Sequence, residues 1–173
     1  MAPKIFSMKL TIHHYKTFTV MALCLGCVTA HAFERDGLSA GMSPEEAVAK
    51  LKKRGVIAAV LPKTSNIETV IFNIGKDNGI LSFCNRSLVA YAPPQSVRNT
   101  TLTTFTDLLA TLTTQHGQGA YEVVSDGSGS AYLRYRWRLV NEIIDLQLMA
   151  NGSTLSTGST YLEPGSCLDR SIN

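Results

Sequence analysis

Apolar and polar residues alternate along much of the chain after residue 55. Alternation with a period of two is typical of β-strands that bury one face. Alternation is clearest over residues 68–74 and 131–139, and with β-rich runs bounded by turn residues it predicts strands over residues 56–61, 68–74, 80–84, 88–91, 121–124, 131–139, 142–149 and 155–162. Turn signals separate some of these strands, because Lys76-Asp77-Asn78-Gly79 and Asn151-Gly152 carry residues that hairpin turns favour.

Two segments instead repeat apolar residues at helical spacing. The first begins at Ser43, with Pro44 in the first helical position and Glu46 completing a capping box, and Gly55 is placed to end it. The second covers residues 100–115. Its apolar stripe consists of Leu102, Phe105, Leu109 and Leu112.

Helix followed by antiparallel strands therefore occurs twice. This order predicts a two-layer α+β fold, with helices packed on antiparallel sheet, and a tandem repeat of one helix-plus-strands unit. We expect the first unit over residues 41–94 and the second over residues 97–164. Residues 33–40 are expected to form a flexible lead-in, and residues 165–173 a C-terminal tail.

The strand over residues 131–139 allows its pairing to be predicted. Its odd positions are apolar, and its even positions carry Arg134, Arg136 and Arg138. A turn at residues 140–141 would pair Trp137 with Ile144 on the apolar face and Arg136 with Asp145 on the other. The same register sets Tyr135 opposite Leu146, Leu133 opposite Leu148 and Arg134 opposite Gln147. Continuing through Asn151-Gly152 would place Leu148 beside Leu155.

The N-terminal 32 residues have the organisation of a secretory signal peptide. Lys4, Lys9 and Lys16 precede an apolar run over residues 18–28, and Ala30-His31-Ala32 supplies small residues before the expected cleavage after Ala32. We therefore expect a periplasmic or secreted protein. Leu25-Gly26-Cys27 also resembles a lipoprotein processing site, which leaves open an envelope structural lipoprotein anchored at Cys27.

The expected mature chain carries no net charge. The whole chain is +3, but the three signal-segment lysines account for this excess, leaving 13 basic and 13 acidic residues. A neutral domain has no electrostatic reason to bind nucleic acid. No later apolar run reaches the roughly 20 residues of a membrane-spanning helix.

Cys84 and Cys167 are the two cysteines that remain after cleavage. In an oxidising compartment an even pair predicts one disulfide. Closing so long a loop would stabilise the fold by about 4 kcal/mol in the chain-entropy model.

Few residues suited to catalysis remain in the expected mature chain. One histidine, His116, remains after cleavage, so no histidine pair is left for a zinc site, and we expect no metal or cofactor. A Cys84–His116 nucleophile pair would require a free thiol, which the disulfide would remove. The Arg134, Arg136 and Arg138 ladder could instead form a partner-binding surface for carboxylates or phosphates, or a solvated face partly neutralised by Asp145.

The segment Gly41-Met42-Ser43-Pro44-Glu45-Glu46-Ala47, followed by a short helix, a glycine and antiparallel strands, resembles the opening of the SmpA/OmlA family of small envelope lipoproteins. The element order is also similar to one unit of the tandem-repeat β-lactamase inhibitory protein architecture. These resemblances imply an exported module that presents a sheet face or loops to another protein.

The sequence thus predicts a non-enzymatic exported binding protein with a protein partner: an inhibitor, an immunity-type protein or an envelope-assembly factor. The alternatives are a small exported hydrolase or thiol enzyme using Cys84 and His116, and the lipoprotein anchored at Cys27.

Overall fold

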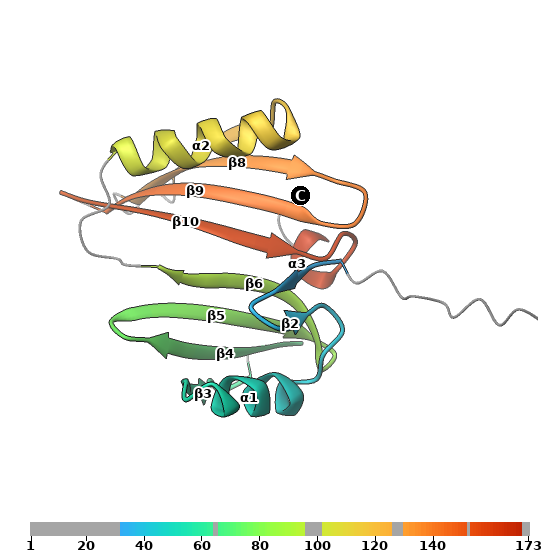
Figure 1. Cartoon of the computed structure of the whole chain (residues 1–173). Helices are drawn as coiled ribbons and strands as arrows, with labels where there is room; N and C mark the ends of the chain where they lie inside the picture. The colour runs from blue at the N-terminus through green and yellow to red at the C-terminus, as the bar shows by residue number, and fades with distance from the viewer. Residues whose placement is uncertain (1–31, 64–65, 96–101, 126–129, 152, 171–173) are drawn as a thin grey trace, which may run out of the picture.

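The computed structural model describes residues 32–63, 66–95, 102–125, 130–151 and 153–170. The predicted signal segment and Cys27 lie outside these residues, except for Ala32. Three helices and ten strands follow one another along the described chain (Figure 1). They are β1 (Glu34–Arg35), β2 (Leu38–Ser39), α1 (Pro44–Lys53), β3 (Ile57–Val60), β4 (Ile67–Ile74), β5 (Asp77–Cys84), β6 (Ser87–Gln95), α2 (Leu102–His116), β7 (Ala120–Ser125), β8 (Ser130–Arg138), β9 (Ile143–Asn151), β10 (Thr154–Leu162) and α3 (Cys167–Arg170).

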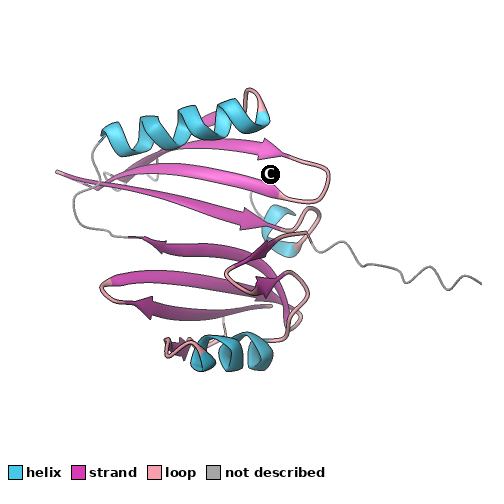
Figure 2. Cartoon of the chain, in the orientation of Figure 1, coloured by secondary structure: helices cyan, strands magenta, loops and turns pink. Residues whose placement is uncertain are grey.

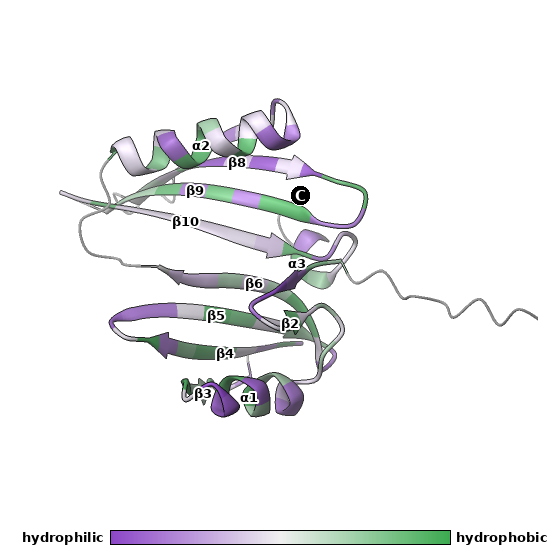
Figure 3. Cartoon of the chain, in the orientation of Figure 1, coloured by the Kyte–Doolittle hydropathy of each residue, from purple (hydrophilic) through white to green (hydrophobic). Residues whose placement is uncertain are grey.

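The molecule is mostly β, so the predicted α+β fold of helices packed on antiparallel sheet is wrong. One eight-stranded antiparallel sheet has the order β3-β4-β5-β6-β10-β9-β8-β7, and β1 and β2 form a separate two-stranded sheet. Figure 2 shows how much of the described chain is strand, and Figure 3 shows hydrophilic residues between hydrophobic ones along β9. The described helices are short, with 10 residues in α1, 15 in α2 and 4 in α3, so strands make up most of the described structure. The sequence pattern locates the two longer helices, but it does not show that strands make up most of the structure.

The two halves of the sheet meet at β6 and β10. Among the described residues, two pairs cross this seam, Tyr91 with Tyr161 and Ala90 with Leu162. Beyond Ala92, β6 continues as Pro93 and Pro94, which have no backbone N–H to donate to a neighbouring strand. The sheet is therefore continuous, but its two halves are joined over a short length. The predicted unit boundaries, 41–94 and 97–164, stay a prediction.

Most predicted strands are present, and the predicted β8–β9 register is confirmed. Trp137 pairs with Ile144 and Arg136 with Asp145, and the other three predicted pairs also occur. Two local details differ. Ile74 pairs with Asp77, so the turn lies at residues 75–76, where Gly75 has a φ of 64°. Leu155 pairs with Ala150 rather than lying beside Leu148, because Asn151 pairs directly with Thr154.

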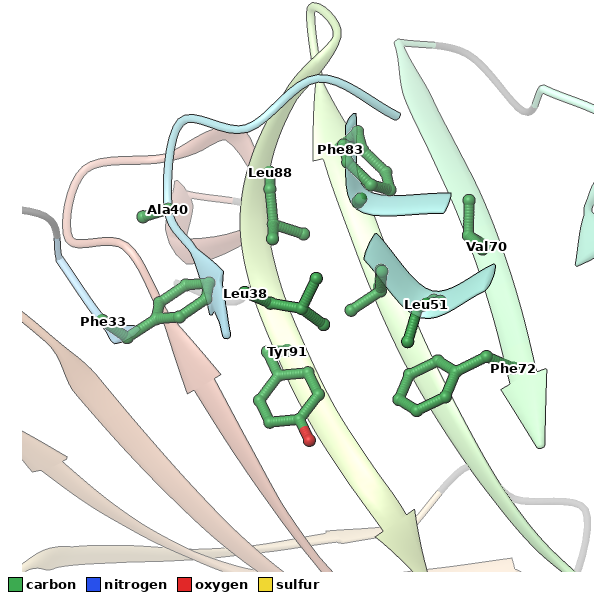
Figure 4. Close-up of a cluster of buried hydrophobic side chains, with 11 residues drawn as sticks. Phe33, Leu38, Ala40, Leu51, Val70, Phe72, Phe83, Leu88 and Tyr91 are labelled. Atoms are coloured by element: carbon green, nitrogen blue, oxygen red, sulfur yellow. The ribbon is translucent and has the colours of Figure 1, made fainter. Parts of the chain in front are cut away.

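One face of the sheet carries the two larger clusters of buried apolar residues, and we call it the helix face. Ala47 and Leu51 of α1 pack with Val70, Phe72, Leu81 and Phe83 (Figure 4). Phe105 and Leu112 of α2 pack with Trp137, Ile144 and Leu146. The capping box predicted at Ser43 and Glu46 is formed, which fixes the start of α1.

Residues 33–40 were expected to be a flexible lead-in, but they form the packed β1–β2 hairpin. Phe33, Leu38 and Ala40 are buried on the helix face (Figure 4). The Tyr91 hydroxyl donates a hydrogen bond to Asp36. The polar residues of this segment lie in its turn and on its exposed side. Its composition therefore does not reveal that three apolar residues anchor it in the core.

The described part of the chain contains no helix with the length and apolar character needed to cross a membrane.

Candidate functional site: the open face of the sheet

The face opposite the helices, which we call the open face, is largely uncovered. Of the three described helices, only α3 joins a buried cluster there, through Leu168. Cross-strand pairing places an apolar row across the first half of this face, consisting of Ala59, Ile71, Ile80 and Ala92. Ile57 and Ile80 are 78% and 42% exposed. The first half of the face is thus aliphatic and accessible.

The second half of the open face is ionic, and its centre is Asp145 on β9. Arg136 Nε donates to Asp145 Oδ1 at 2.7 Å, and Arg136 Nη2 donates to Oδ2 at 2.6 Å. This two-point pair follows from the cross-strand register of Arg136 and Asp145. The hydrogen bonds to the Asp145 carboxylate raise the pKa of Arg136 above its ordinary value.

Arg134 is held one step further along β8. Its Nε lies 2.9 Å from Glu122 Oε1 on β7, and its Nη2 donates to the Tyr132 hydroxyl at 3.0 Å. Its Nη1 lies 3.9 Å from Asp145 Oδ2. The Arg134 side chain is only 6% exposed, so its charge is balanced within the protein rather than by solvent.

Arg138 pairs with α3 through Asp169. Arg138 Nη2 lies 3.0 Å from Asp169 Oδ1, and the Gly165 N–H donates to Asp169 Oδ2 at 3.0 Å. The hydrogen bond from Arg138, followed by that from Gly165, keeps the pKa of Asp169 below its ordinary value despite burial. Arg136 Nη1 also approaches Asp169 Oδ1, at 3.7 Å.

The arginine ladder and its acids together carry no formal charge. Three arginines face Glu122, Asp145 and Asp169. Arg134 and Arg136 are 6% and 12% exposed, whereas Arg138 is 47% exposed. The structure therefore brings the three predicted arginines together, each in an ion pair with an acidic residue of the same chain. A role for them in binding a partner stays a prediction.

Sequence reasoning identified Asp145 but missed the other two acids. Glu122 could have been found, because extending the predicted register to the strand over residues 121–124 sets it opposite Arg134. Asp169 could not, since it lies 31 residues from Arg138 in a tail with no strand pattern.

A hollow of about 240 Å³ lies in the middle of the open face, at the seam between the half-sheets. Small residues form much of its lining, and Ile80, Gln147, Leu162 and Leu168 add larger side chains around them. The hollow is lined by Ile80, Ser82, Ala90, Ala92, Asp145, Gln147, Thr160, Leu162 and Leu168. A second hollow of about 440 Å³ lies between residues 32–35 and residues 139–142.

The predicted disulfide is confirmed, since Cys84 at the end of β5 is joined to Cys167 at the start of α3. It holds α3 against the open face, where Leu168 packs with Ala90, Ile143 and Leu162. The Cys84 sulfur is therefore not available as a thiol, which a Cys84–His116 enzyme would require.

His116 ends α2 and lines a hollow beside Trp137 and Arg138. Trp137 is buried in the helix-face core, and its indole N–H donates to the Gly117 carbonyl at 2.8 Å. Within the described ranges, no group of three or more His, Cys, Asp or Glu side chains is arranged to hold a metal ion.

No protein-family model, no curated protein and no solved structure matches this chain. The resemblance to SmpA/OmlA proteins and to the β-lactamase inhibitory protein architecture stays a prediction.

Proposed function

We propose that this protein is an exported, non-enzymatic binding protein that engages a protein partner through the open face of its eight-stranded sheet. The observation that carries the proposal is the one-sided packing. Both longer helices and the β1–β2 hairpin lie in the helix-face clusters, whereas the open face displays an aliphatic row beside an ionic network.

The aliphatic part of this face supports a macromolecular partner. Ile57 and Ile80 are exposed at the first half of this face. Ile80 continues the cross-strand row of Ala59 and Ile71, and a contiguous exposed apolar patch on a folded protein marks an interaction site. A protein interface has an apolar centre surrounded by polar groups. The row of Ala59, Ile71, Ile80 and Ala92, with the arginine ladder beside it, has this composition.

The side chains of the ionic part of the face are already held in place by their ion pairs, which favours binding. The Arg136–Asp145 pair has both hydrogen bonds in place, and Asp169 ties α3 to β8. Side chains that are held before binding lose little conformational entropy when a partner docks.

Export is the second part of the proposal and rests on the signal-peptide pattern of residues 1–32. The Cys84–Cys167 disulfide agrees with an oxidising compartment, where such bonds form and persist. An inhibitor, an immunity-type protein and an envelope-assembly factor would all use a binding face of this kind.

The test compares two charge insertions in a capture experiment. Mature protein, and variants carrying Ile80→Glu on the open face or Val140→Glu at the β8–β9 turn, are immobilised and exposed to envelope and extracellular fractions. Val140 is 95% exposed, so its variant is the matched control. We expect one protein to be retained by the wild type and Val140→Glu, with at least about tenfold weaker affinity for Ile80→Glu.

Equal retention by all three proteins would show that the interface does not lie on the open face. No retained protein, together with hydrolysis of a substrate panel by the wild type, would contradict the binding-protein proposal and favour the enzyme.

A further inference from the structure

The hollow at the seam gives the open face a place for one specific group of the partner. Cross-strand pairing shows how it forms. Ser82 pairs with Ala90 and Ile80 with Ala92, and Thr160 lies next to Asp145 on β9. Small side chains on β5, β6 and β10 thus meet where the sheet is least tightly joined, with Ile80, Gln147 and Leu168 also lining the hollow.

The size of the hollow limits its occupant. A volume of about 240 Å³ exceeds the roughly 150 Å³ that suffices for one benzene molecule in an apolar protein cavity. The hollow therefore has room for one six-membered ring with a substituent, but not for a folded element.

The charges of the hollow limit the occupant further. Asp145 is the one ionisable residue among the described residues that line it, and both of its oxygens accept hydrogen bonds from Arg136. A cation entering the hollow would find the Asp145 carboxylate already paired with Arg136, and an anion would be repelled by that carboxylate. The hollow therefore favours an uncharged group.

The remaining lining groups suit a ring with one polar end. Aliphatic side chains come from Ile80, Leu162 and Leu168, while Ser82, Thr160 and Gln147 offer hydroxyl and amide groups. Tyrosine combines an apolar ring with a hydroxyl that can hydrogen-bond, and it is enriched at the centres of protein interfaces.

We propose that this hollow receives one uncharged aromatic side chain, a tyrosine, from the protein partner. This inference rests on the proposed function and adds the chemistry of the contact. The Cys84–Cys167 disulfide and the Asp169–Arg138 pair keep Leu168 in place as part of the lining.

The first arm of the test uses p-cresol, which has the structure of a tyrosine side chain, and the disulfide-bonded mature protein. Propanoate and n-butylammonium serve as charged probes. We expect saturable amide shifts with p-cresol at Ser82, Ala92, Gln147 and Thr160, with a Kd on the order of millimolar for so small a ligand. Absence of saturable shifts, or equal binding of a charged probe in the hollow, would overturn the inference.

Two matched pairs of variants localise the binding. Ala92→Leu fills the hollow, whereas Ala59→Leu makes the same change in the same cross-strand row outside it. Ser82→Leu and Thr69→Leu form a second pair, since these two residues are cross-strand neighbours and only Ser82 lines the hollow. We expect a loss of at least about tenfold in p-cresol affinity for the first member of each pair and less than about twofold for the second. Near-UV circular dichroism of all four variants verifies that they fold.

The second arm measures retention of the captured partner. Ala92→Leu should weaken it, and Val140→Glu, the exposed control outside the open face, should not. Unchanged partner affinity in Ala92→Leu would overturn this inference while leaving the proposed function intact. Failure of the wild type to retain any protein would overturn both.

Discussion

At the residue scale, the charges on β8 are matched by acids from three other elements. Glu122 comes from β7, Asp145 from β9 and Asp169 from α3. Burying an ionised side chain costs several kcal/mol unless its partner is well placed. The network is therefore tolerated because each arginine has a carboxylate within reach, and removing one acid leaves a buried positive charge.

We expect Asp145→Asn to destabilise the protein by about 3–5 kcal/mol, the usual cost of removing one partner of a buried ion pair. Arg136 would lose a charged acceptor on both of its hydrogen-bonding nitrogens. Urea unfolding followed by the fluorescence of Trp137, the single tryptophan of the chain, measures the change. Replacing both partners, Arg136→Met with Asp145→Leu, should recover most of the loss because no unpaired charge remains.

The exposed pair of Arg86 and Glu45 provides the control. Both side chains are exposed, so Arg86→Gln should leave the free energy of unfolding nearly unchanged. An Asp145→Asn cost as small as that of Arg86→Gln would show that water, rather than Asp145, balances the ladder.

At the element scale, the β4–β5 pair depends on one glycine. Gly79 lies opposite Phe72, and a Cβ placed on Gly79 would come within 2.2 Å of the Phe72 ring. The ring is buried in the core beside Tyr91, so it has little space in which to move. The sequence pattern had assigned Gly79 to a turn, but in the structure it lies inside β5.

We expect Gly79→Ala to destabilise the protein by about 1–3 kcal/mol, because the added methyl group overpacks the Phe72 ring. In a Phe72→Leu background the same change should cost less than about 1 kcal/mol, since the ring is absent. A double-mutant cycle in urea gives the coupling between the two positions. Additive costs would show that the loss comes from the β5 backbone and not from contact with Phe72.

Two features of the site could be predicted from the sequence, the Arg136–Asp145 ion pair and the Cys84–Cys167 disulfide. The Arg136–Asp145 pair follows from the alternation of two strands joined by a short turn. The Cys84–Cys167 pair follows from counting the cysteines that the predicted signal cleavage would leave. The β1–β2 hairpin, Asp169 and the hollow depend instead on contacts between distant segments. The hollow joins residues of β5, β6, β9, β10 and α3, an assembly that no local pattern contains.

At the scale of the whole molecule, both chain ends of the described region reinforce the seam between the half-sheets. On the helix face, Arg35 lies 4.4 Å above the Tyr161 ring and pairs with Glu142, while Tyr91 bonds to Asp36. On the open face, α3 reaches from Cys84 on β5 to Arg138 on β8. The hairpin and α3 thus hold together two half-sheets that share two residue pairs in their described strands.

The disulfide should therefore stabilise the seam more than the rest of the protein. We expect the double variant Cys84→Ser, Cys167→Ser to lose up to about 4 kcal/mol in the chain-entropy model. Part of this loss should be local, because a freed α3 no longer holds Asp169 against Arg138 or Leu168 against Ala90. Native-state hydrogen exchange separates the two effects, since local opening raises exchange in one region before global unfolding.

Exchange should increase first in α3 and in the paired residues Tyr91, Tyr161 and Leu162, while Val70 and Leu81 on the α1 side change only with global stability. The variant should also bind p-cresol more weakly, because Leu168 is part of the lining of the hollow. A uniform increase in exchange, with p-cresol affinity unchanged, would mean that the disulfide acts through the unfolded chain alone. The seam would then be held by the β1–β2 hairpin and the two strand pairs, without α3.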